Sequence, residues 1–330
     1  MQTWTFHGGR LSAVRRHYGE HPDGWLDLST GINPHAWPGA SDVDVDWRRL
    51  PDEAELADLE RAAAAYFGTD ASHVCALPGT EVGLRLLGEF APVARAVHAA
   101  PGYRTHGEVF PEVVTSGPGA LADAAAQGRS ILIANPNNPD GRVSEPEVLL
   151  GLARELARSE AWLVVDEAFA DALPETSIAR HVSDALPLVV MRSFGKFFGL
   201  PGLRLGFAVG PREVIARFRR TLGSWPVSTA AQRIGAGAYR DEAWITGMRA
   251  KLEAEAEALG AVLARRGYRA FGGCPLFRLI ETDDAGDLFE VLVRRGILTR
   301  PFDYNSRWLR LGLPGSPEAL QRLERALAIG

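Results

Sequence analysis

The chain has 330 residues, of which 46% are hydrophobic and 23% are charged, a composition typical of a folded globular protein. This length exceeds what a single hydrophobic core usually serves, so two domains are predicted. A net charge of -5 argues against nucleic acid or an anionic membrane as the main partner. The two cysteines, Cys75 and Cys274, lack the spacing of a disulfide framework or a metal site, and no apolar run reaches membrane-spanning length. We therefore expect a cytoplasmic protein without a bound metal.

The first 40 residues show little periodicity and are expected to form an N-terminal arm. A helix is predicted to begin after Asp52 and to end at Gly68, because a capping residue precedes apolar positions that recur on one face. Beyond it, short apolar runs alternate with helical patterns, at residues 73–77, 95–99, 112–115, 130–134, 162–166, 188–191 and 204–209. Runs of this kind predict about seven buried strands of a mainly parallel sheet, covered by helices on both faces.

After about residue 220 the pattern changes. A long helical stretch is predicted over residues 229–266, followed by shorter segments at 277–281, 288–294, 297–300 and 308–313. We therefore expect three parts: an arm over residues 1–40, a large α/β domain over 41–223, and a smaller α+β domain over 224–330.

Lysine is almost absent from the chain. Of its 36 lysine and arginine residues only Lys196 and Lys251 are lysines. Lys251 lies in a charged helical pattern and is interpreted as a surface residue. Lys196 lies in a segment rich in Phe and Gly, and lysine, unlike arginine, can lose its proton and attack a carbonyl carbon to form a Schiff base. Lys196 is therefore the candidate covalent catalyst.

Several polar residues follow directly after predicted strands: Gly79, Thr80, Glu81, Tyr103, Asn138, Asp166 and Ser193. In open α/β sheets ligands bind at the carboxyl ends of the strands. A loop after a strand is also commonly polar for reasons of turn formation alone. The complementary chemistry of these residues nevertheless predicts one ligand site at this edge.

A lysine-bound pyridoxal 5'-phosphate would need a phosphate site. The amides of Gly79, Thr80 and Glu81, at the start of a predicted helix, could bind phosphate, although the same residues also suit an ordinary helix cap. Ser193 and Arg204 could add a hydroxyl and a guanidinium. Arg204 is predicted within an apolar strand, where a buried charge requires an anionic partner.

The ring of the same cofactor needs three further partners. Asp166 could keep the ring nitrogen protonated, or bond to nearby backbone amides instead. Tyr103 could stack on the ring or serve as a core residue. Asn138 could donate to the 3'-oxygen, or could simply belong to the turn that its Asn-Pro-rich surroundings predict.

Taken together, four segments resemble the aspartate-aminotransferase-like enzymes of fold type I: Asn-Pro-Asn-Asn-Pro-x-Gly at 135–141, Asp-Glu-Ala-Phe at 166–169, Ser-x-x-Lys at 193–196 and Gly-Leu-Arg-x-Gly-Phe at 202–207. The resemblance covers essentially the whole chain. It implies the fold of a PLP-dependent transferase and a homodimer. It also implies the cofactor roles given above for each strand-end residue, with Lys196 as the Schiff-base lysine, and Arg310 as the anchor of a substrate carboxylate.

Within this fold the narrower resemblance is to the threonine-phosphate decarboxylases of cobalamin biosynthesis, which are close relatives of histidinol-phosphate aminotransferases. It rests on residues 7–10, 27–34 and 166–171. Phe169 stands where the aminotransferases usually have a tyrosine. Two departures are Leu50, in place of a tyrosine that reaches the partner's cofactor phosphate in relatives, and Gly31, where an asparagine is common.

The resemblance implies decarboxylation of L-threonine O-3-phosphate to (R)-1-amino-2-propanol O-2-phosphate. The implied substrate contacts are His7, Asn33, Asn138, Arg300 and Arg310, with Arg300 and His7 as candidates for the substrate phosphate. An aminotransferase acting on histidinol phosphate or an aromatic amino acid remains the alternative, and a non-catalytic relative is a second. A dinucleotide-binding protein is excluded, because no Gly-x-Gly-x-x-Gly follows the first predicted strand.

Overall fold

The computed structural model describes residues 2–5, 8–90 and 96–328. The chain forms two compact units. Unit 1 comprises Met1–His35, Pro139–Gly141 and Met248–Gly330, and unit 2 comprises Ala36–Asn138 and Arg142–Gly247.

Unit 2 is built on a seven-stranded sheet of order β2-β8-β7-β6-β5-β3-β4. Its strands are β2 (Val74–Leu77), β3 (Ala96–Ala99), β4 (Val113–Ser116), β5 (Ser130–Ala134), β6 (Leu163–Asp166), β7 (Leu188–Ser193) and β8 (Gly206–Val209). Only β8 runs antiparallel to its neighbours β2 and β7, while the other pairs are parallel. The predicted α/β fold with a mainly parallel seven-stranded sheet is confirmed.

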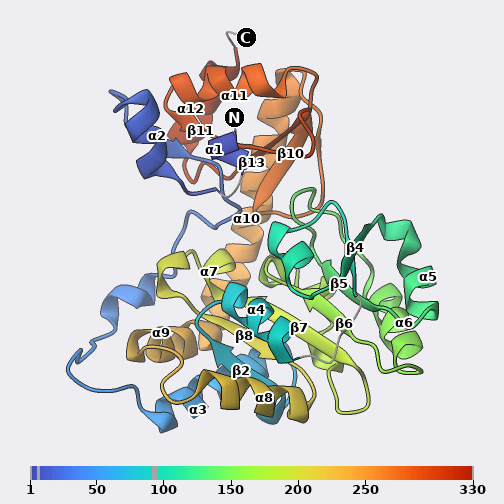
Figure 1. The fold of residues 1–330 in the computed structure, drawn as a ribbon. Helices are drawn as coiled ribbons and strands as arrows, with labels where there is room; N and C mark the ends of the chain where they lie inside the picture. The colour runs from blue at the N-terminus through green and yellow to red at the C-terminus, as the bar shows by residue number, and fades with distance from the viewer. Residues whose placement is uncertain (1, 6–7, 91–95, 329–330) are drawn as a thin grey trace. The chain divides into compact units, whose positions relative to one another are not determined.

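The helices of unit 2 are α3 (Glu53–Phe67), α4 (Thr80–Phe90), α5 (Leu121–Ala126), α6 (Pro146–Leu156), α7 (Phe194–Phe197), α8 (Arg212–Leu222) and α9 (Thr229–Arg240). In Figure 1, α5 and α6 lie beside the β3-β5-β6 part of the sheet, and α3 lies by β2 at the other end.

The two faces of the sheet bury different side chains, because successive residues of a strand point to opposite faces. Met191 and Ala208 face a core completed by Leu84 and Leu87 of α4 and by Phe218 of α8. On β8 the preceding residue, Phe207, packs instead against Phe67 of α3 and Tyr239 of α9, with ring centroids 5.6 Å from each. The sheet is therefore covered on both sides, as predicted.

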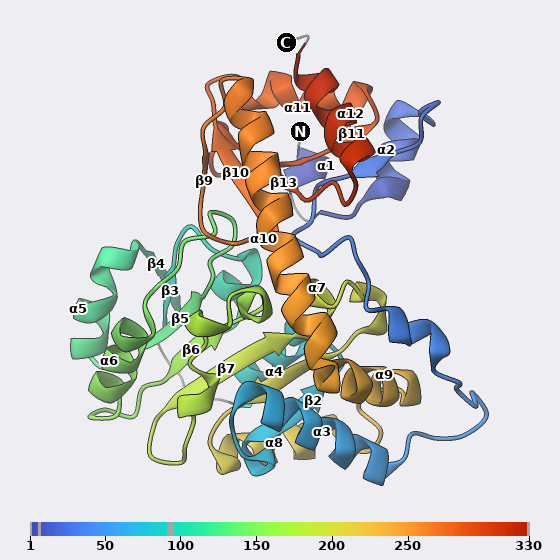
Figure 2. The ribbon, with the colours of Figure 1, turned by 180° about the vertical axis from the view of Figure 1, so that it is seen from behind.

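Unit 1 contains a four-stranded antiparallel sheet of order β12-β13-β10-β9 and a parallel pair, β1-β11. Its strands are β1 (Leu26–Asp27), β9 (Ala270–Phe271), β10 (Phe277–Glu281), β11 (Ile297–Leu298), β12 (Arg300–Pro301) and β13 (Trp308–Gly312). Its helices are α1 (Gln2–Thr5), α2 (Leu11–Tyr18), α11 (Ala285–Arg294) and α12 (Pro317–Leu327), and α10 (Glu242–Arg265) is one continuous helix shared by both units (Figure 2).

The predicted limits of α3 are confirmed. The carboxylate of Asp52 accepts hydrogen bonds from the amides of Ala54 and Glu55, and Gly68 ends the helix at φ +73°, a conformation that favours glycine.

One helix prediction is wrong, and one helix was not predicted. The helical stretch predicted over 229–266 is interrupted at Asp241, whose carboxylate accepts from the amide of Trp244 and from the indole N–H of Trp37. That carboxylate caps α10, so a new helix begins there. In the first 40 residues α2 was not predicted, because it has no capping side chain and buries only Val14 completely.

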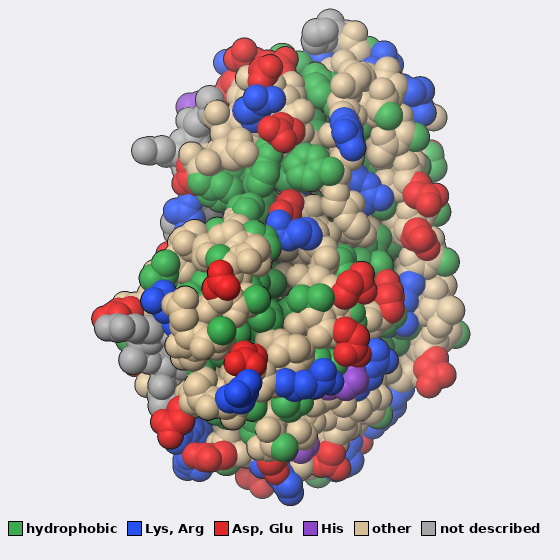
Figure 3. Space-filling model, turned by 90° about the vertical axis from the view of Figure 1, so that its right-hand side faces the viewer, with side chains coloured by type: hydrophobic (Ala, Val, Ile, Leu, Met, Phe, Trp, Pro, Cys, Tyr) green, Lys and Arg blue, Asp and Glu red, His purple; other side chains and the backbone are tan. Residues whose placement is uncertain are grey.

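Among the described residues, no helix is long and apolar enough to cross a membrane. On the face drawn in Figure 3, acidic and basic side chains lie among one another and do not gather into a patch of one sign.

Candidate active site

The ends of the strands in unit 2 bring the predicted cofactor residues to one edge of the sheet. The last residue of β2, Leu77, is in register with Gly206 at the start of β8, which pairs in turn with Ser193 at the end of β7. On β6, Asp166 pairs with Met191 of β7 and with Ala134 of β5. The loops that carry Gly79, Asn138 and Lys196 therefore leave the sheet at the same edge, where ligands bind in open α/β sheets.

Lys196 lies in the short helix α7, immediately after β7, and its side chain is half-buried. The aromatic residues around it anchor this loop in the core: Phe194 and Phe198 stack with centroids 4.5 Å apart, and Phe197 is fully buried. Gly195 has no room for a side chain, since a Cβ atom there would lie 2.8 Å from Cα of Pro201. The Phe- and Gly-rich sequence around the lysine therefore holds its backbone in one place.

Asp166 is buried at the end of β6 and is held at both carboxylate oxygens. Oδ2 lies 3.0 Å from Nε2 of His106, and Oδ1 accepts a hydrogen bond from the amide of Ala168 at 3.1 Å. His106 is itself fully buried, in the 3-10 helix η3 (Arg104–Glu108). A carboxylate fixed in this way has a defined orientation, which is what a partner for a protonated ring nitrogen requires.

Tyr103 precedes η3, and its hydroxyl donates a hydrogen bond to Oε2 of Glu81 at 3.0 Å. Burial, and next the neighbouring Glu81, raise the pKa of Tyr103 to about 12, so the hydroxyl stays protonated at neutral pH. Thr105 also donates to the Glu81 carboxylate, and Arg85 pairs with it at 2.9 Å. The side chain of Glu81 thus fixes the tyrosine loop, and only its backbone amide is suited to phosphate.

The Gly79 turn at the start of α4 has the features of an anion site. Gly79 has φ +96°, and a Cβ atom there would lie 2.7 Å from Nη2 of Arg204. A Cβ atom on Gly206 would lie 2.8 Å from the amide nitrogen of Thr80. A guanidinium and the first amide of an eleven-residue helix therefore converge on a turn that only glycine leaves open, which fits a phosphate group.

The prediction that Arg204 lies inside a buried strand is wrong. Strand β8 begins at Gly206, and Arg204 is exposed, has φ +55°, and donates to the carbonyl of Pro201 at 3.1 Å. The left-handed conformation ends the 3-10 turn before the strand and directs the guanidinium to the Gly79 turn. The argument from a buried charge therefore fails, although the side chain reaches the predicted neighbour.

The asparagines of the loop after β5 have different roles. Asn135 donates to the carbonyls of Ser144 and Thr176, and Asn137 donates to the carbonyl of Pro101 at 2.8 Å. These two side chains hold the loop in shape. The half-buried Asn138 follows them at the strand edge, as the sequence predicted.

Unit 1 contains two adjacent arginines, on neighbouring antiparallel strands. Arg300 of β12 is in register with Arg310 of β13. Burial, and next Arg300, lower the pKa of Arg310 to about 9, so the charged form is disfavoured in this environment. An anionic ligand would offset that cost, because buried charges in proteins need a counter-charge.

The segment around Ser29 contacts Arg310 in unit 1. Arg310 donates to the carbonyl of Ser29 at 3.2 Å, and the Ser29 hydroxyl accepts from the amide of Gly9 and donates to Asp27. A Cβ atom on Gly8 would lie 2.3 Å from the Ser29 carbonyl oxygen, which explains the glycine at this position. Arg300 donates to the carbonyl of Thr5.

Asn33 is buried, and its side-chain oxygen accepts from the amide of His35 at 2.8 Å. The predicted contact His7 lies outside the described residues.

Sequence reasoning missed His106 and gave Ser29 no role. His106 lies three residues after Tyr103, in a loop that follows a strand, so it could have been added to the strand-end residues. Its partner Asp166 is 60 residues away, and only the fold brings them together. Ser29 lies within the segment 27–34, which was singled out only as a family motif.

Three features lie at one edge of this sheet: a lysine, a buried acid held by a histidine, and a glycine-lined turn suited to phosphate. Together they define the class of PLP-dependent enzymes with the aminotransferase fold. Residues 119–327 match the profile of the family described as "Aminotransferase class I and II". The chain belongs to this family.

Relatives and solved structures agree with this assignment. A threonine-phosphate decarboxylase of Sinorhizobium sp. is 39% identical over 98% of this chain and 97% of its own length. The fold matches the histidinol-phosphate aminotransferase of Sinorhizobium meliloti in complex with pyridoxal-5'-phosphate, with TM-score 0.82 and 20% identity over 96% of this chain and 92% of that one. It also matches the L-threonine-O-3-phosphate decarboxylase of Porphyromonas gingivalis, with TM-score 0.79 and 20% identity over 91% of this chain and 97% of that one.

Proposed function

We propose that this protein is a PLP-dependent carboxy-lyase that converts L-threonine O-3-phosphate into (R)-1-amino-2-propanol O-2-phosphate in cobalamin biosynthesis. The observation that carries the proposal is the similarity to a threonine-phosphate decarboxylase, at 39% identity over 98% of the chain. The local geometry supports the cofactor and the anionic substrate separately, one in each unit.

The residues at the sheet edge of unit 2 would hold the cofactor. Lys196 would bind its aldehyde carbon, the Gly79 turn with Thr80, Ser193 and Arg204 would bind its phosphate, and Asn138 would donate to its 3'-oxygen. When bound, pyridoxal 5'-phosphate supplies an electron sink for the bond that breaks at the substrate Cα. The buried Asp166, fixed by His106, would keep the ring nitrogen protonated, which that sink requires.

Tyr103 would cover the ring of the cofactor, because its hydroxyl is tied to Glu81 and its ring is therefore fixed. Phe169 is buried three residues after Asp166 and offers no hydroxyl to the 3'-oxygen. Asn138 would then be the donor to that oxygen. This difference from the usual tyrosine of the aminotransferases favours the decarboxylase.

The arginine pair of unit 1 suits a substrate that carries two anionic groups. L-Threonine O-3-phosphate has a carboxylate and a phosphate, and Arg310 and Arg300 would each bind one of them, with Asn33 and His7 as further contacts. The residues that hold the carboxylate would set its orientation, and so would decide between loss of CO2 and loss of a proton at Cα. Lys196 would then return a proton to Cα.

A single assay tests the reaction. The cofactor-loaded protein is incubated with L-threonine O-3-phosphate and no keto-acid acceptor, and CO2 and aminopropanol phosphate are measured together. Release of both in equal amounts over many turnovers is expected. No release, with amino transfer from histidinol phosphate to 2-oxoglutarate, would replace this proposal with the aminotransferase.

Replacing Lys196 tests the covalent attachment. Lys196→Ala should fold normally and lose the yellow absorbance of the bound cofactor, while Lys251→Ala should keep it. An unchanged spectrum in Lys196→Ala would remove Lys196 from this role.

The family resemblance also leads us to propose a homodimer and a cytoplasmic location. Sedimentation of the cofactor-loaded protein at micromolar concentration tests the first, and a mass of one chain would contradict it.

A further inference from the structure

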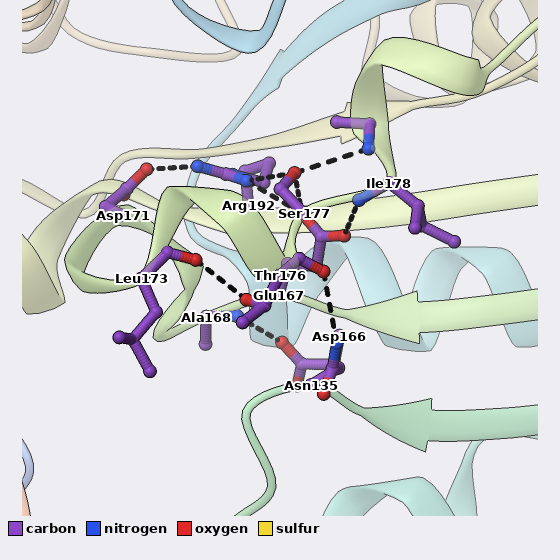
Figure 4. Close-up of polar contacts among 11 residues, drawn as sticks. Asn135, Asp166, Glu167, Ala168, Asp171, Leu173, Thr176, Ser177, Ile178 and Arg192 are labelled. Carbon is purple, nitrogen blue, oxygen red and sulfur yellow. Dashed lines mark hydrogen bonds and ion pairs between the residues drawn. The ribbon is translucent and has the colours of Figure 1, made fainter. Parts of the chain in front are cut away.

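A buried ionic cluster in unit 2 includes the residue that follows Asp166. We call it the Arg192 clamp, and it consists of Glu167, Asp171, Ser177 and Arg192 (Figure 4). Arg192 Nη1 lies 2.7 Å from Oε2 of Glu167 and 2.8 Å from Oγ of Ser177, and Nη2 bonds to Asp171. Ser177 donates to the same oxygen of Glu167, whose other oxygen accepts from the amide of Ile178 at 2.7 Å.

The Arg192 clamp is shielded from solvent. The Glu167 and Asp171 residues are completely buried, and Arg192 is 3% exposed. Burial raises the pKa of Glu167. Burial by itself lowers the pKa of Arg192, but the two carboxylates beside the guanidinium raise that pKa overall. The guanidinium also lies over the ring of Phe67, 4.7 Å from its centroid.

Two members of the Arg192 clamp, Glu167 and Arg192, are each adjacent in sequence to a residue of the candidate cofactor site. Glu167 directly follows Asp166, the candidate partner of the cofactor ring. Arg192 directly precedes Ser193, at the start of the Ser-x-x-Lys segment that carries Lys196. Their backbones are joined as well, since the amide of Glu167 donates to the carbonyl of Met191 at 2.9 Å. The Arg192 clamp therefore connects the two loops that present Asp166 and Lys196.

Stability alone is a poor explanation for such a cluster. Removing each charged side chain from water costs several kcal/mol, and buried ion pairs can often be replaced by well-packed hydrophobic side chains of similar volume without loss of stability. The guanidinium adds direction to the contact: its two terminal nitrogens, Nη1 and Nη2, are tied to different points on the loop after β6.

We propose that Arg192, with Glu167 and Asp171, is a positioning residue that sets the relative placement of Asp166 and Lys196, and so the ionisation and orientation of the cofactor between them. The proposal rests on the proposed cofactor binding, but not on which reaction follows. It assigns a role to a cluster whose side chains are not among those proposed to hold the cofactor.

The test uses a variant in which the charges are removed together: Arg192→Met with Glu167→Gln and Asp171→Asn. This variant leaves no single charge buried without a partner. Thermal unfolding, visible circular dichroism per bound cofactor, and the pH midpoint of the visible absorbance change are measured on the cofactor-loaded protein. The matched control is the neutral pair Arg219→Met with Glu60→Gln, an ion pair of 2.8 Å in the same unit but joining α8 to α3.

We expect the clamp variant to melt within about 5 °C of the wild type. Its visible circular dichroism should fall at least about twofold and its pH midpoint should shift by about half a unit, since one pKa unit corresponds to only ~1.4 kcal/mol of interaction. The control should change neither visible signal. A folded clamp variant with the visible signals of the wild type would overturn the proposal.

If the clamp variant does not fold, Asp171→Asn alone is measured in the same way. Unchanged visible signals in that variant, at full cofactor loading, would also overturn the proposal, whereas a shift of its pH midpoint would support it. A wild-type protein that never binds the cofactor would instead overturn the proposed function, so the two failures are distinguishable.

Discussion

At the scale of single residues, the candidate catalytic group Asp166 depends on a neighbour, His106, that has no direct part in the proposed reaction. Replacing it by leucine would leave Oδ2 of the buried Asp166 without the imidazole that lies 3.0 Å away. Leaving a buried carboxylate oxygen unsatisfied costs about 1–3 kcal/mol. We therefore expect His106→Leu to bind pyridoxal 5'-phosphate at least about tenfold more weakly, as measured by titrating the apoprotein and following visible absorbance.

The matched control for this variant is His73→Leu. The imidazole of His73 likewise makes one hydrogen bond, with the carbonyl of Gly210 at 2.9 Å, and lies 3.9 Å from the carboxylate of Asp184. It lies just before β2, at the opposite edge of the sheet. It should bind the cofactor like the wild type. Equal affinity in both variants would mean that His106 does not support the ring-nitrogen partner.

A second residue-scale prediction concerns Ser29, which joins the amide of Gly9, the carboxylate of Asp27 and, through its carbonyl, the guanidinium of Arg310. Ser29→Ala removes the hydroxyl and the two hydrogen bonds it makes, each worth ~1 kcal/mol. The expected result is a rise of about five- to tenfold in KM for L-threonine O-3-phosphate with a smaller change in kcat. Ser41→Ala, which removes an exposed hydroxyl bonded to the carbonyl of Pro38, is the control. A change in kcat alone would contradict a role in holding the substrate.

At the scale of elements, the lysine loop is held by packing. Gly195→Ala would place a Cβ atom 2.8 Å from Cα of Pro201, a contact that backbone atoms cannot easily relieve. Overpacking of this kind typically costs about 1–3 kcal/mol. The free energy of unfolding of the apoprotein in urea should fall by that amount.

Gly151→Ala in α6 is the control for this substitution, because a Cβ atom there meets nothing within 4 Å. An alanine inside a helix should raise the free energy of unfolding by about 0.5–1 kcal/mol. Two variants with the same chemical change should therefore move in opposite directions. If Gly195→Ala is as stable as the wild type, the loop is more compliant than its packing implies.

Elements and whole-molecule arrangement differ in how far the sequence predicts them. The strands of unit 2 and the limits of α3 follow from local signals: continuous apolar runs, an Asp cap and a terminal Gly. The break at Asp241 does not, because its capping carboxylate is fixed by Trp37, more than 200 residues away. Arg204 shows the same limit, since only the fold decides between a buried strand position and an exposed left-handed one.

The residues of the candidate site also differ in how far the sequence predicts them. Residues that follow strands could be found from the sequence, since parallel strands bring their carboxyl ends together whatever their order. His106 beside Asp166, Glu81 beside Tyr103 and Ser29 beside Arg310 could not, because each pair joins segments that are separate in the chain and meet only in the fold. The sequence thus predicts the chemical groups, and the fold decides which groups orient them.

The stability of the whole molecule should depend on acid through a histidine outside the proposed chemistry. His98 of β3 is buried, with its ring centroid 5.8 Å from that of His106. Burial, and next His106, lower the pKa of His98 to about 4, against 6.5 for an exposed histidine. Between these values the unfolded chain binds a proton that the folded chain does not. The contribution of His98 to stability is therefore constant at higher pH and is lost as the pH falls from about 6.5 towards 4.

Between pH 7 and pH 5 this one group should lower the free energy of unfolding by about 2 kcal/mol. In His98→Leu the imidazole is gone, so the loss over the same interval should be smaller by that amount, whatever the variant's stability at pH 7. Urea unfolding of the apoprotein at the two pH values measures the difference, and the exposed His181→Gln serves as the control with an unchanged pH dependence. Because the comparison is made within each variant, the packing cost of the substitution cancels. An equal loss in His98→Leu and in the wild type would mean that His98 is already protonated in the fold or exposed to water.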